Sequence, residues 1–555
     1  MIETLVQALI GLNRLAEVCS EWGRRFLRSL QGARIDLRDG PCGESAGASR
    51  RHLVAAIAQS IPVESAIQNA LGVMHLAMPD KVEEVCWHPL ILRGASSGES
   101  GSGLDSTLVT TRTRIADLAQ TPDGTTVSVG GFIETVRDQK KVQFIILRDE
   151  SGSAQLVNPA LREDDPEAGS SPERRALTDS ISELSAGTFV RVTGELKLDE
   201  RVKLGGLEVK IHSLEVTGVA EPEPPIAEDS SVDKRMDWRF LDLRRPAANL
   251  IFRAQTAFEH GMRSWWVENN WIEIHTPKFM ASASESRAEL FEVGYFDTTA
   301  YLAQSPQFFK QMAQPAGFGA VFEIAPAFRA DPSFTARHAT EFTSVDAEMS
   351  WVDSHHDVMA MHEQVLIAGI TAVVEKYGAQ ISDVMGVELT VPTSPFPRVT
   401  LQEAREIVSA GGYDIPRTDG DLDPEAERRL SAYIEETHGH PFVFVTDYDT
   451  SIRPFYHMRH ADNDALTKSY DLLFRGTEIS TGAQREHRIE ILEAQAKDKG
   501  MDLDELQSYC DFFRHGVPPH GGFGMGLARV MMLMLEQSSI RETTFLFRGP
   551  NRLLP

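Results

Sequence analysis

The chain has 555 residues, of which 42% are hydrophobic and 25% charged, and this length predicts three or four domains of ordinary size. Its 81 acidic and 55 basic residues leave a formal net charge of −26, which disfavours nonspecific coating of DNA or of an anionic membrane. The four cysteines lack metal-type spacing, and no apolar run reaches about 18 residues. We therefore expect a soluble protein of the reducing cytoplasm with no membrane association.

Two changes in composition divide the chain. Residues 94–103 are rich in glycine and serine, as in a flexible linker, and residues 221–225 form a stiffer, proline-rich hinge. In the first segment apolar residues recur every three or four positions, which predicts helices. That segment either docks a partner or RNA, or packs on its own protein, and we favour the second alternative. The predicted units are a helical extension over 1–93, a linker over 94–110, a domain over 111–220, a hinge over 221–245 and a domain over 246–555.

The middle domain alternates short strand patterns with turns. Five such patterns within about 110 residues favour a small β-barrel, for which an OB-fold is a natural candidate. The predicted strands cover residues 126–133, 142–147, 154–158, 188–196 and 207–217. A barrel of this kind can stack the bases of single-stranded nucleic acid on aromatic side chains, although composition alone leaves its role open.

The C-terminal domain begins with an amphipathic helix entered at Pro246. Helices then alternate with strand patterns, which predicts an α/β (α+β) domain with a mostly antiparallel sheet flanked by helices. The predicted strands cover residues 271–274, 320–325, 341–349, 442–447, 469–474 and 477–481.

Several clusters in this domain carry residues suited to nucleotide chemistry. The glycine run that ends at Arg529 suits a phosphate site, but a helix entered through a glycine turn would read the same way. Asp471 and Glu478 could share Mg²⁺ with substrate phosphates, or could pair with nearby arginines. Arg329 and Arg337 could clamp a polyphosphate or neutralise surrounding acids. Taken singly, each cluster leaves both alternatives open.

Together and in this order, the clusters resemble the three signature motifs of class II aminoacyl-tRNA synthetases, in particular the archaeal/eukaryotic type of aspartyl-tRNA synthetase. The resemblance spans about residues 111–555. Motif 1 resembles the helix at 247–269 and the strand up to Pro277, motif 2 resembles residues 321–343, and motif 3 resembles residues 522–529. It implies an OB-fold that binds the tRNA anticodon, a class II catalytic domain and a homodimer formed through motif 1. It also implies L-aspartate, ATP and tRNA as substrates and Mg²⁺ as cofactor.

The resemblance also implies how the amino acid is recognised. Lys310 and Arg485 would hold the side-chain carboxylate of the substrate, and we expect them to favour aspartate because a neutral asparagine amide would leave two buried cations unpaired. Asparaginyl-tRNA synthetases lack the lysine. The aspartate site implied by the resemblance consists of Glu285, Gln307, Lys310, Arg329, Tyr456, Thr481 and Arg485.

For ATP, the resemblance implies Arg329 on the α-phosphate and an adenine ring between Phe342 and Arg529. The full ATP site would comprise Arg329, Asp331, Arg337, His338, Phe342, Glu478, Gly526 and Arg529. The magnesium positions would be Asp471, Glu478 and Thr481, and the residues that carry catalysis would be Arg329, Lys310, Arg485 and Arg529.

In the barrel, the positions that match the anticodon-reading residues of the family are Phe144, Gln155 and Glu208. The competing interpretation of Phe144 is an ordinary core aromatic. The position that the family usually gives to tryptophan in the first strand holds Phe132, so the choice between aspartate tRNA alone and both aspartate and asparagine tRNAs stays open.

Three positions depart from the family pattern. Ala528 replaces a usual carboxylate before the motif 3 arginine, Asp331 replaces a usual glutamate, and Ser286 and Arg287 follow Glu285 where the family usually has two glycines. With alanine at 528 we expect Arg529 to be less well fixed, unless another carboxylate supplies the contact. These departures keep two alternatives open. One is a specialised paralogue that activates aspartate for another acceptor or resists an inhibitor, and the other is a weakened tRNA-binding module.

Overall fold

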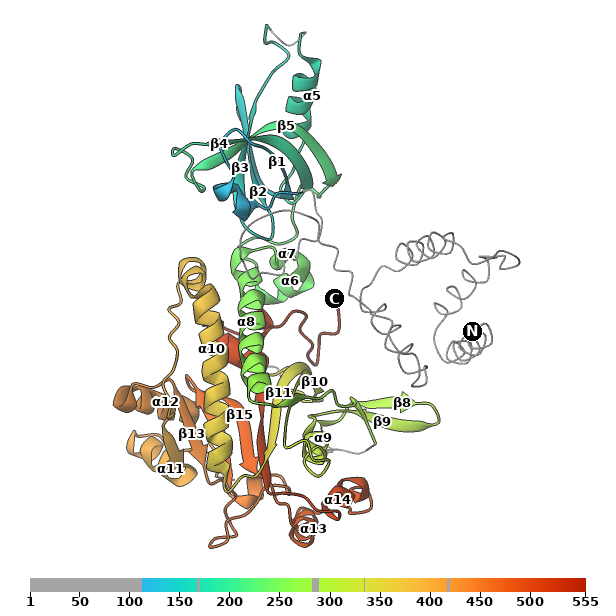
Figure 1. Ribbon diagram of the computed structural model, residues 1–555, viewed down its shortest axis with the longest axis vertical. Helices are drawn as coiled ribbons and strands as arrows, with labels where there is room; N and C mark the ends of the chain where they lie inside the picture. Colours follow the sequence, from blue (N-terminus) through green and yellow to red (C-terminus); the bar gives the residue numbers. More distant parts are fainter. Residues whose placement is uncertain (1–111, 167–169, 282–288, 334, 417–419) are drawn as a thin grey trace, which may run out of the picture. The chain divides into compact units, whose positions relative to one another are not determined.

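The computed structural model describes residues 112–166, 170–281, 289–333, 335–416 and 420–555. The predicted N-terminal helical extension, the linker and Glu285 lie outside these residues. These residues form a β-barrel and a larger C-terminal domain (Figure 1).

The first described unit is a closed five-stranded barrel with strand order β1-β2-β3-β5-β4. In each strand alternate side chains point inward, because successive residues of a strand face opposite sides, and the apolar ones form a single core. The predicted OB-fold is confirmed. The elements are η1 (Ile115–Gln120), β1 (Thr126–Asp138), β2 (Val142–Arg148), β3 (Ser153–Pro159), α5 (Pro172–Ser182), β4 (Phe189–Leu198) and β5 (Leu207–Gly218).

The C-terminal domain is built on an eight-stranded sheet with order β12-β13-β14-β15-β16-β11-β10-β6. Only its outer pairs, β12 with β13 and β10 with β6, are parallel, which confirms the mostly antiparallel sheet. The strands are β6 (Ile272–Glu273), β10 (Ala320–Phe328), β11 (Glu341–Ser350), β12 (Arg398–Thr400), β13 (Phe442–Thr446), β14 (Ser469–Phe474), β15 (Thr477–Gln484) and β16 (His520–Gly526). A second small sheet contains β7 (Phe279–Met280), β9 (Thr298–Leu302) and β8 (Glu292–Tyr295), in that order.

Two long helices, α8 (Pro246–Glu268) and α10 (His355–Met385), run side by side and form one core with the sheet (Figure 1). Their backbones approach closely because glycines face each other, and a Cβ on Gly261 would come within 2.6 Å of the Ala368 carbonyl oxygen. The remaining helices are α6 (Val232–Asp237), α7 (Arg239–Asp242), α9 (Gln307–Met312), α11 (Leu401–Ala410), α12 (Pro424–His438), η3 (Thr450–Ile452), α13 (Ile489–Asp498), α14 (Gln507–Phe513), α15 (Leu527–Met534) and α16 (Ile540–Thr543).

Helix α10 is the one helix among the described residues that is long and apolar enough to cross a membrane by length and composition. However, 56% of its apolar window is buried inside the protein. Its packing on α8 and the sheet accounts for that composition, so the helix is weak evidence for a membrane span.

The glycine run of residues 521–526 forms strand β16 and is not a glycine turn. Strand β16 lies between β11 and β15, and a Cβ on Gly522 would come within 2.0 Å of the Ala347 carbonyl oxygen and 2.3 Å of Glu348 Oε2. The absence of side chains therefore lets a buried carboxylate lie against the strand. Helix α15 begins directly after Gly526 and carries Arg529.

Candidate functional site

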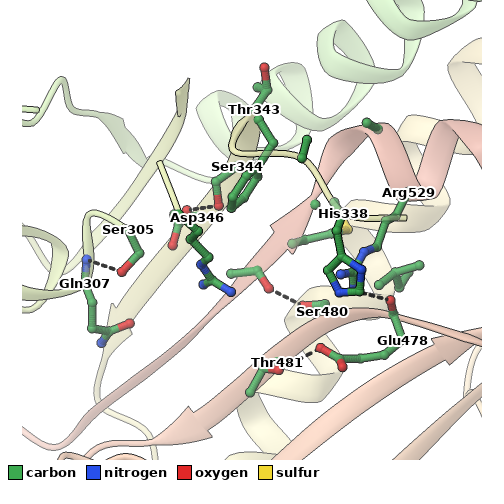
Figure 2. A pocket seen from close by; sticks show the side chains of 18 of the residues that line it. Ser305, Gln307, His338, Thr343, Ser344, Asp346, Glu478, Ser480, Thr481 and Arg529 are labelled. Carbon is green, nitrogen blue, oxygen red and sulfur yellow. Dashed lines mark hydrogen bonds between the residues drawn. The ribbon is translucent and has the colours of Figure 1, made fainter. Parts of the chain in front are cut away.

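One face of the catalytic sheet holds a cavity of about 490 Å³, a size usual for small-ligand sites. It is lined from α9, the β10–β11 loop, β11, β15, β16 and α15. Among the predicted site residues, those that line it are Gln307, Lys310, Arg329, Asp331, Arg337, His338, Phe342, Tyr456, Glu478, Thr481, Arg485, Gly526 and Arg529. In Figure 2, Ser305, Gln307 and Asp346 lie toward one end of this cavity, and His338, Arg529 and Glu478 lie toward the other.

At the first end both predicted cations are buried and already paired with carboxylates of β11. Lys310 Nζ donates to Asp346 Oδ1 and to the Phe523 carbonyl oxygen, each at 2.8 Å. Arg485 donates to both oxygens of Glu348 at 2.9 and 3.2 Å. The sequence argument assumed that asparagine would leave two cations unpaired. That assumption is wrong, because both cations have carboxylate partners before any substrate binds.

This geometry distinguishes aspartate from asparagine for a different reason. Hydrogen bonds to described residues occupy four of the five N–H groups of Arg485. Besides Glu348, the acceptors are His457 Nε2 at 3.1 Å and the Gly522 carbonyl oxygen at 2.9 Å. Asp346 also accepts from the Ser344 hydroxyl at 2.5 Å. Lysine and arginine side chains can only donate hydrogen bonds. A carboxylate oxygen beside them can accept, whereas an asparagine NH₂ group in the same place would face donors.

Sequence reasoning missed Asp346, Glu348, Arg453 and His457. A usable signal existed for the first two, since Asp346 and Glu348 stand two residues apart in a strand and therefore share one buried face. Two acids on the interior face of a strand require cationic partners. His457 gave no such signal, because a lone histidine beside apolar residues is common in protein cores.

The second end carries the residues expected to bind ATP. The Arg329 guanidinium lies 5.6 Å from the centroid of the Phe342 ring. Arg529 donates from Nε to the Arg337 carbonyl oxygen at 3.2 Å and from Nη1 to the Glu478 carbonyl oxygen at 3.0 Å. Two backbone acceptors thus fix Arg529 without a carboxylate at 528, so the expectation that Ala528 leaves this arginine poorly fixed is wrong.

Helix α12 contributes a carboxylate next to this end. Arg337 Nη1 donates to Glu427 Oε2 at 3.1 Å. Burial, with a smaller effect from the Glu478 carboxylate, raises the pKa of Glu427 to about 7. Burial and the nearby Arg529 guanidinium lower the pKa of His338, so its imidazole is neutral near pH 7.

The predicted metal ligands come from neighbouring strands, with Asp471 on β14 directly opposite Thr481 on β15. Asp471 Oδ2 accepts from Arg453 at 2.5 Å, while its buried Oδ1 meets no hydrogen-bond donor at good geometry among the described residues. Thr481 Oγ1 donates to Glu478 Oε1 at 3.2 Å. Burial and the Asp471 carboxylate raise the pKa of Glu478. The described residues hold no group of three or more His, Cys, Asp or Glu placed for a metal, but two carboxylates are what Mg²⁺ takes when phosphates supply further ligands.

The three predicted anticodon residues share one face of the barrel. Phe144 is half-buried and lies outside the barrel core, whereas its neighbours Gln143 and Ile145 point inward. Gln155 pairs with Ile146 across β2–β3 and with Glu208 across β3–β5. Its amide nitrogen donates to Glu208 Oε2 at 2.8 Å. The interpretation of Phe144 as a core aromatic is therefore wrong, and an aromatic ring with two polar neighbours faces outward.

Comparison with known proteins yields two family matches. Residues 231–548 match tRNA synthetases class II (D, K and N), and residues 127–217 match an OB-fold nucleic acid binding domain. An aspartate–tRNA(Asp/Asn) ligase of Aeropyrum pernix is 41% identical over 449 residues, which cover 80% of this chain and 99% of the relative. An aspartate–tRNA(Asp) ligase of Thermococcus kodakarensis is 37% identical, with 79% and 98% covered.

Solved structures with the same fold include two synthetases. Asparaginyl-tRNA synthetase from Pyrococcus horikoshii, complexed with asparaginyl-adenylate, superposes with a TM-score of 0.72 at 29% identity and covers 80% of this chain and 99% of its own. Aspartyl-tRNA synthetase from Entamoeba histolytica gives a TM-score of 0.71 at 29% identity, with 83% and 97% covered.

Proposed function

The chain belongs to the class II tRNA synthetases of the D, K and N group, and we propose that it is an aspartate–tRNA ligase. In the first step the aspartate α-carboxylate attacks the α-phosphorus of ATP, which forms aspartyl-adenylate and releases pyrophosphate. In the second step the terminal ribose hydroxyl of tRNA takes the aspartyl group and AMP leaves.

The observation that carries the choice of aspartate is the pair of buried cations at one end of the cavity. Lys310 and Arg485 are each 2% exposed, come from different elements and line the same cavity. Their counter-carboxylates keep this end electrically balanced, so an incoming side-chain carboxylate meets N–H donors that are already oriented. The resemblance adds Gln307 and Tyr456, which we assign to the α-amino end of the substrate, as well as Glu285.

Catalysis of the first step requires positioning and charge neutralisation more than proton transfer. Arg329 would bind the α-phosphate, while Arg337 and His338 would bind the outer phosphates. Phe342 and Arg529 line the same cavity, and an aromatic ring together with a guanidinium group suits an adenine ring. Asp471, Glu478 and Thr481 would hold Mg²⁺, and the orphaned buried Oδ1 of Asp471 fits a cation ligand. Bound Mg²⁺ would neutralise phosphate charge.

The barrel would bind the tRNA anticodon through the face that carries Phe144, with Gln155 and Glu208 reading base edges. We also propose a cytoplasmic homodimer. Its support is that α8 and β6 expose apolar side chains, with Val267 58% and Ile272 43% exposed, in the segment that resembles motif 1. The domain limits of 111–220 and 246–555, with a hinge over 221–245, remain part of this proposal.

Charging of purified tRNA with labelled aspartate tests the function. We expect the full-length protein to attach aspartate to tRNA that carries an aspartate anticodon, and a parallel reaction with an asparagine anticodon decides whether it serves both. Activation of aspartate without transfer to either tRNA would favour the paralogue that uses another acceptor. Binding of tRNA without activation would favour the weakened module.

A further inference from the structure

Behind the amino-acid end of the cavity, four buried polar side chains form a continuous hydrogen-bonded chain. They are 5% exposed or less and come from α9, α14 and the start of β16: Gln307, Gln311, Tyr509 and His520. Of these four, only Gln307 lines the cavity. These hydrogen bonds therefore connect the start of β16 to Gln307 at the cavity wall.

The direction of every hydrogen bond in this chain is fixed from its far end. His520 Nδ1 lies 2.9 Å from the Pro518 carbonyl oxygen, which can only accept, so Nδ1 carries the proton. Burial lowers the pKa of His520 to about 4, and the ring is therefore neutral near pH 7. In a neutral imidazole with a protonated Nδ1, Nε2 carries a lone pair and can only accept a hydrogen bond.

That lone pair sets the orientation of the next amide. Gln311 Nε2 lies 2.9 Å from His520 Nε2 and must be the donor. Gln311 Oε1 consequently points the other way, where it accepts from Tyr509 Oη at 3.0 Å and from Gln307 Nε2 at 2.9 Å. A flipped Gln311 would place its oxygen against the His520 lone pair, and this buried repulsion opposes the flip.

The same logic orients Gln307. Because its amide nitrogen donates to Gln311, its amide oxygen is the atom left for the substrate. Figure 2 shows that oxygen on the side of the other pocket residues, with the nitrogen turned away. An acceptor held in this direction suits a substrate cation, and the cation of an amino acid is its α-ammonium group.

We propose that His520, Gln311 and Tyr509 act as positioning residues that lock the Gln307 amide with its oxygen toward the α-ammonium group of the substrate. This inference rests on the proposed function, since it takes the amino acid to bind beside Gln307. Without this relay of His520, Gln311 and Tyr509, the Gln307 amide could rotate and present its NH₂ to the ammonium group. Loss of the relay should therefore weaken binding of the ammonium group and not of the side-chain carboxylate.

The test compares L-aspartate with succinate, which has the same two carboxylates and lacks the ammonium group. Dissociation constants are measured by calorimetry on the full chain, with ATP binding and the unfolding midpoint as fold controls. The unchanged protein should bind aspartate at least about tenfold more tightly than succinate, since hydrogen bonds to charged groups are strong. A protein that binds neither, or that prefers succinate, contradicts the proposed function and with it this inference.

Gln311→Met, which keeps the chain length and removes both polar ends, should lower the aspartate-to-succinate preference by about tenfold while succinate affinity stays within about twofold. His520→Leu should act in the same direction. His520→Gln, which restores an acceptor for Gln311, should recover most of the preference, and Tyr509→Phe should lose only about two- to threefold. An unchanged preference in folded Gln311→Met or Tyr509→Phe protein, or an equal loss for both ligands, would overturn the relay and leave the proposed function standing.

Discussion

The Arg485 guanidinium and the Glu348 carboxylate lie fork to fork, with Nε 2.9 Å from Oε1 and Nη2 3.2 Å from Oε2. Both side chains are buried, at 2% and 0% exposed. The arginine proposed to bind the substrate is thus held by an internal partner, and Lys310 Nζ lies 3.8 Å from the same glutamate. In the proposed function, each cation would bind the substrate with the donors that its internal contacts leave over.

Arg485→Leu should abolish aspartate activation and also lower stability. It removes a donor for the substrate, and it leaves Glu348 as a buried carboxylate without its guanidinium, which costs roughly 3–5 kcal/mol. The variant Arg485→Leu/Glu348→Gln removes the stranded charge, so it should regain most of the lost unfolding midpoint and none of the activation. ATP–pyrophosphate exchange and thermal unfolding of the three proteins separate the two roles. Exchange that recovers in the double variant would show that Arg485 serves only the fold.

Phe144→Ala should weaken tRNA charging by the loss of one stacked base, about 1–3 kcal/mol, and leave exchange without tRNA unchanged. The matched control is Ile145→Ala on the same strand, because Ile145 is fully buried in the barrel core. We expect it to lower the unfolding midpoint of the barrel, at a cost of roughly 2–5 kcal/mol. A comparable loss of barrel stability in both variants would contradict the assignment of Phe144 to the tRNA face.

Ala528→Glu should not improve the use of ATP, although it restores the residue that the family usually carries. Arg529 already donates to two backbone carbonyl oxygens, and Ala528 packs against an apolar cluster that contains Met236, Met532 and Phe547. An added carboxylate would be partly buried against this cluster, so we expect an unchanged or higher KM for ATP. A KM that falls several-fold would show that Arg529 was poorly fixed after all.

Glu427→Gln should change how stability depends on pH. The pKa of Glu427 is raised from about 4.5 to about 7 in the folded protein, so between these values the folded state keeps a proton that the unfolded state has lost. The Glu427 carboxyl therefore lowers the free energy of unfolding as pH rises from about 4.5 to about 7, by roughly 3 kcal/mol in total. Unfolding midpoints should agree near pH 4.5 and diverge by pH 8, with the variant more stable. Parallel curves for the two proteins would contradict the raised pKa.

The fold was accessible from the sequence where patterns are local. Alternation of apolar residues located all five barrel strands, and β14 was predicted over the residues that it occupies. The resemblance to class II synthetases placed residues of α9, β15 and α15 in one site, because the order of the motifs matches a family of known topology. These features need only periodicity and motif order, which a single sequence contains.

The features that the sequence did not predict depend on contacts between residues that are distant in the sequence. Glu348 and Arg485 are 137 residues apart, and Gln311 and His520 are 209 apart, so no local pattern links them. The backbone acceptors of Arg529 were equally inaccessible, because every residue has a carbonyl oxygen and only the fold determines which one is within reach. The resemblance therefore named cations that line one cavity, but the sequence did not show what holds them before substrate binds.

Aspartate-dependent ATP–pyrophosphate exchange with the full-length protein, run beside asparagine at equal concentration, tests the central claim most directly. The two cations at this end of the cavity predict exchange with aspartate and a kcat/KM for asparagine lower by at least about a thousandfold, because an amide NH₂ group placed against Lys310 and Arg485 would face their donors. Equal exchange with both amino acids, or exchange with asparagine alone, would contradict the assignment of Lys310 and Arg485 to a substrate carboxylate.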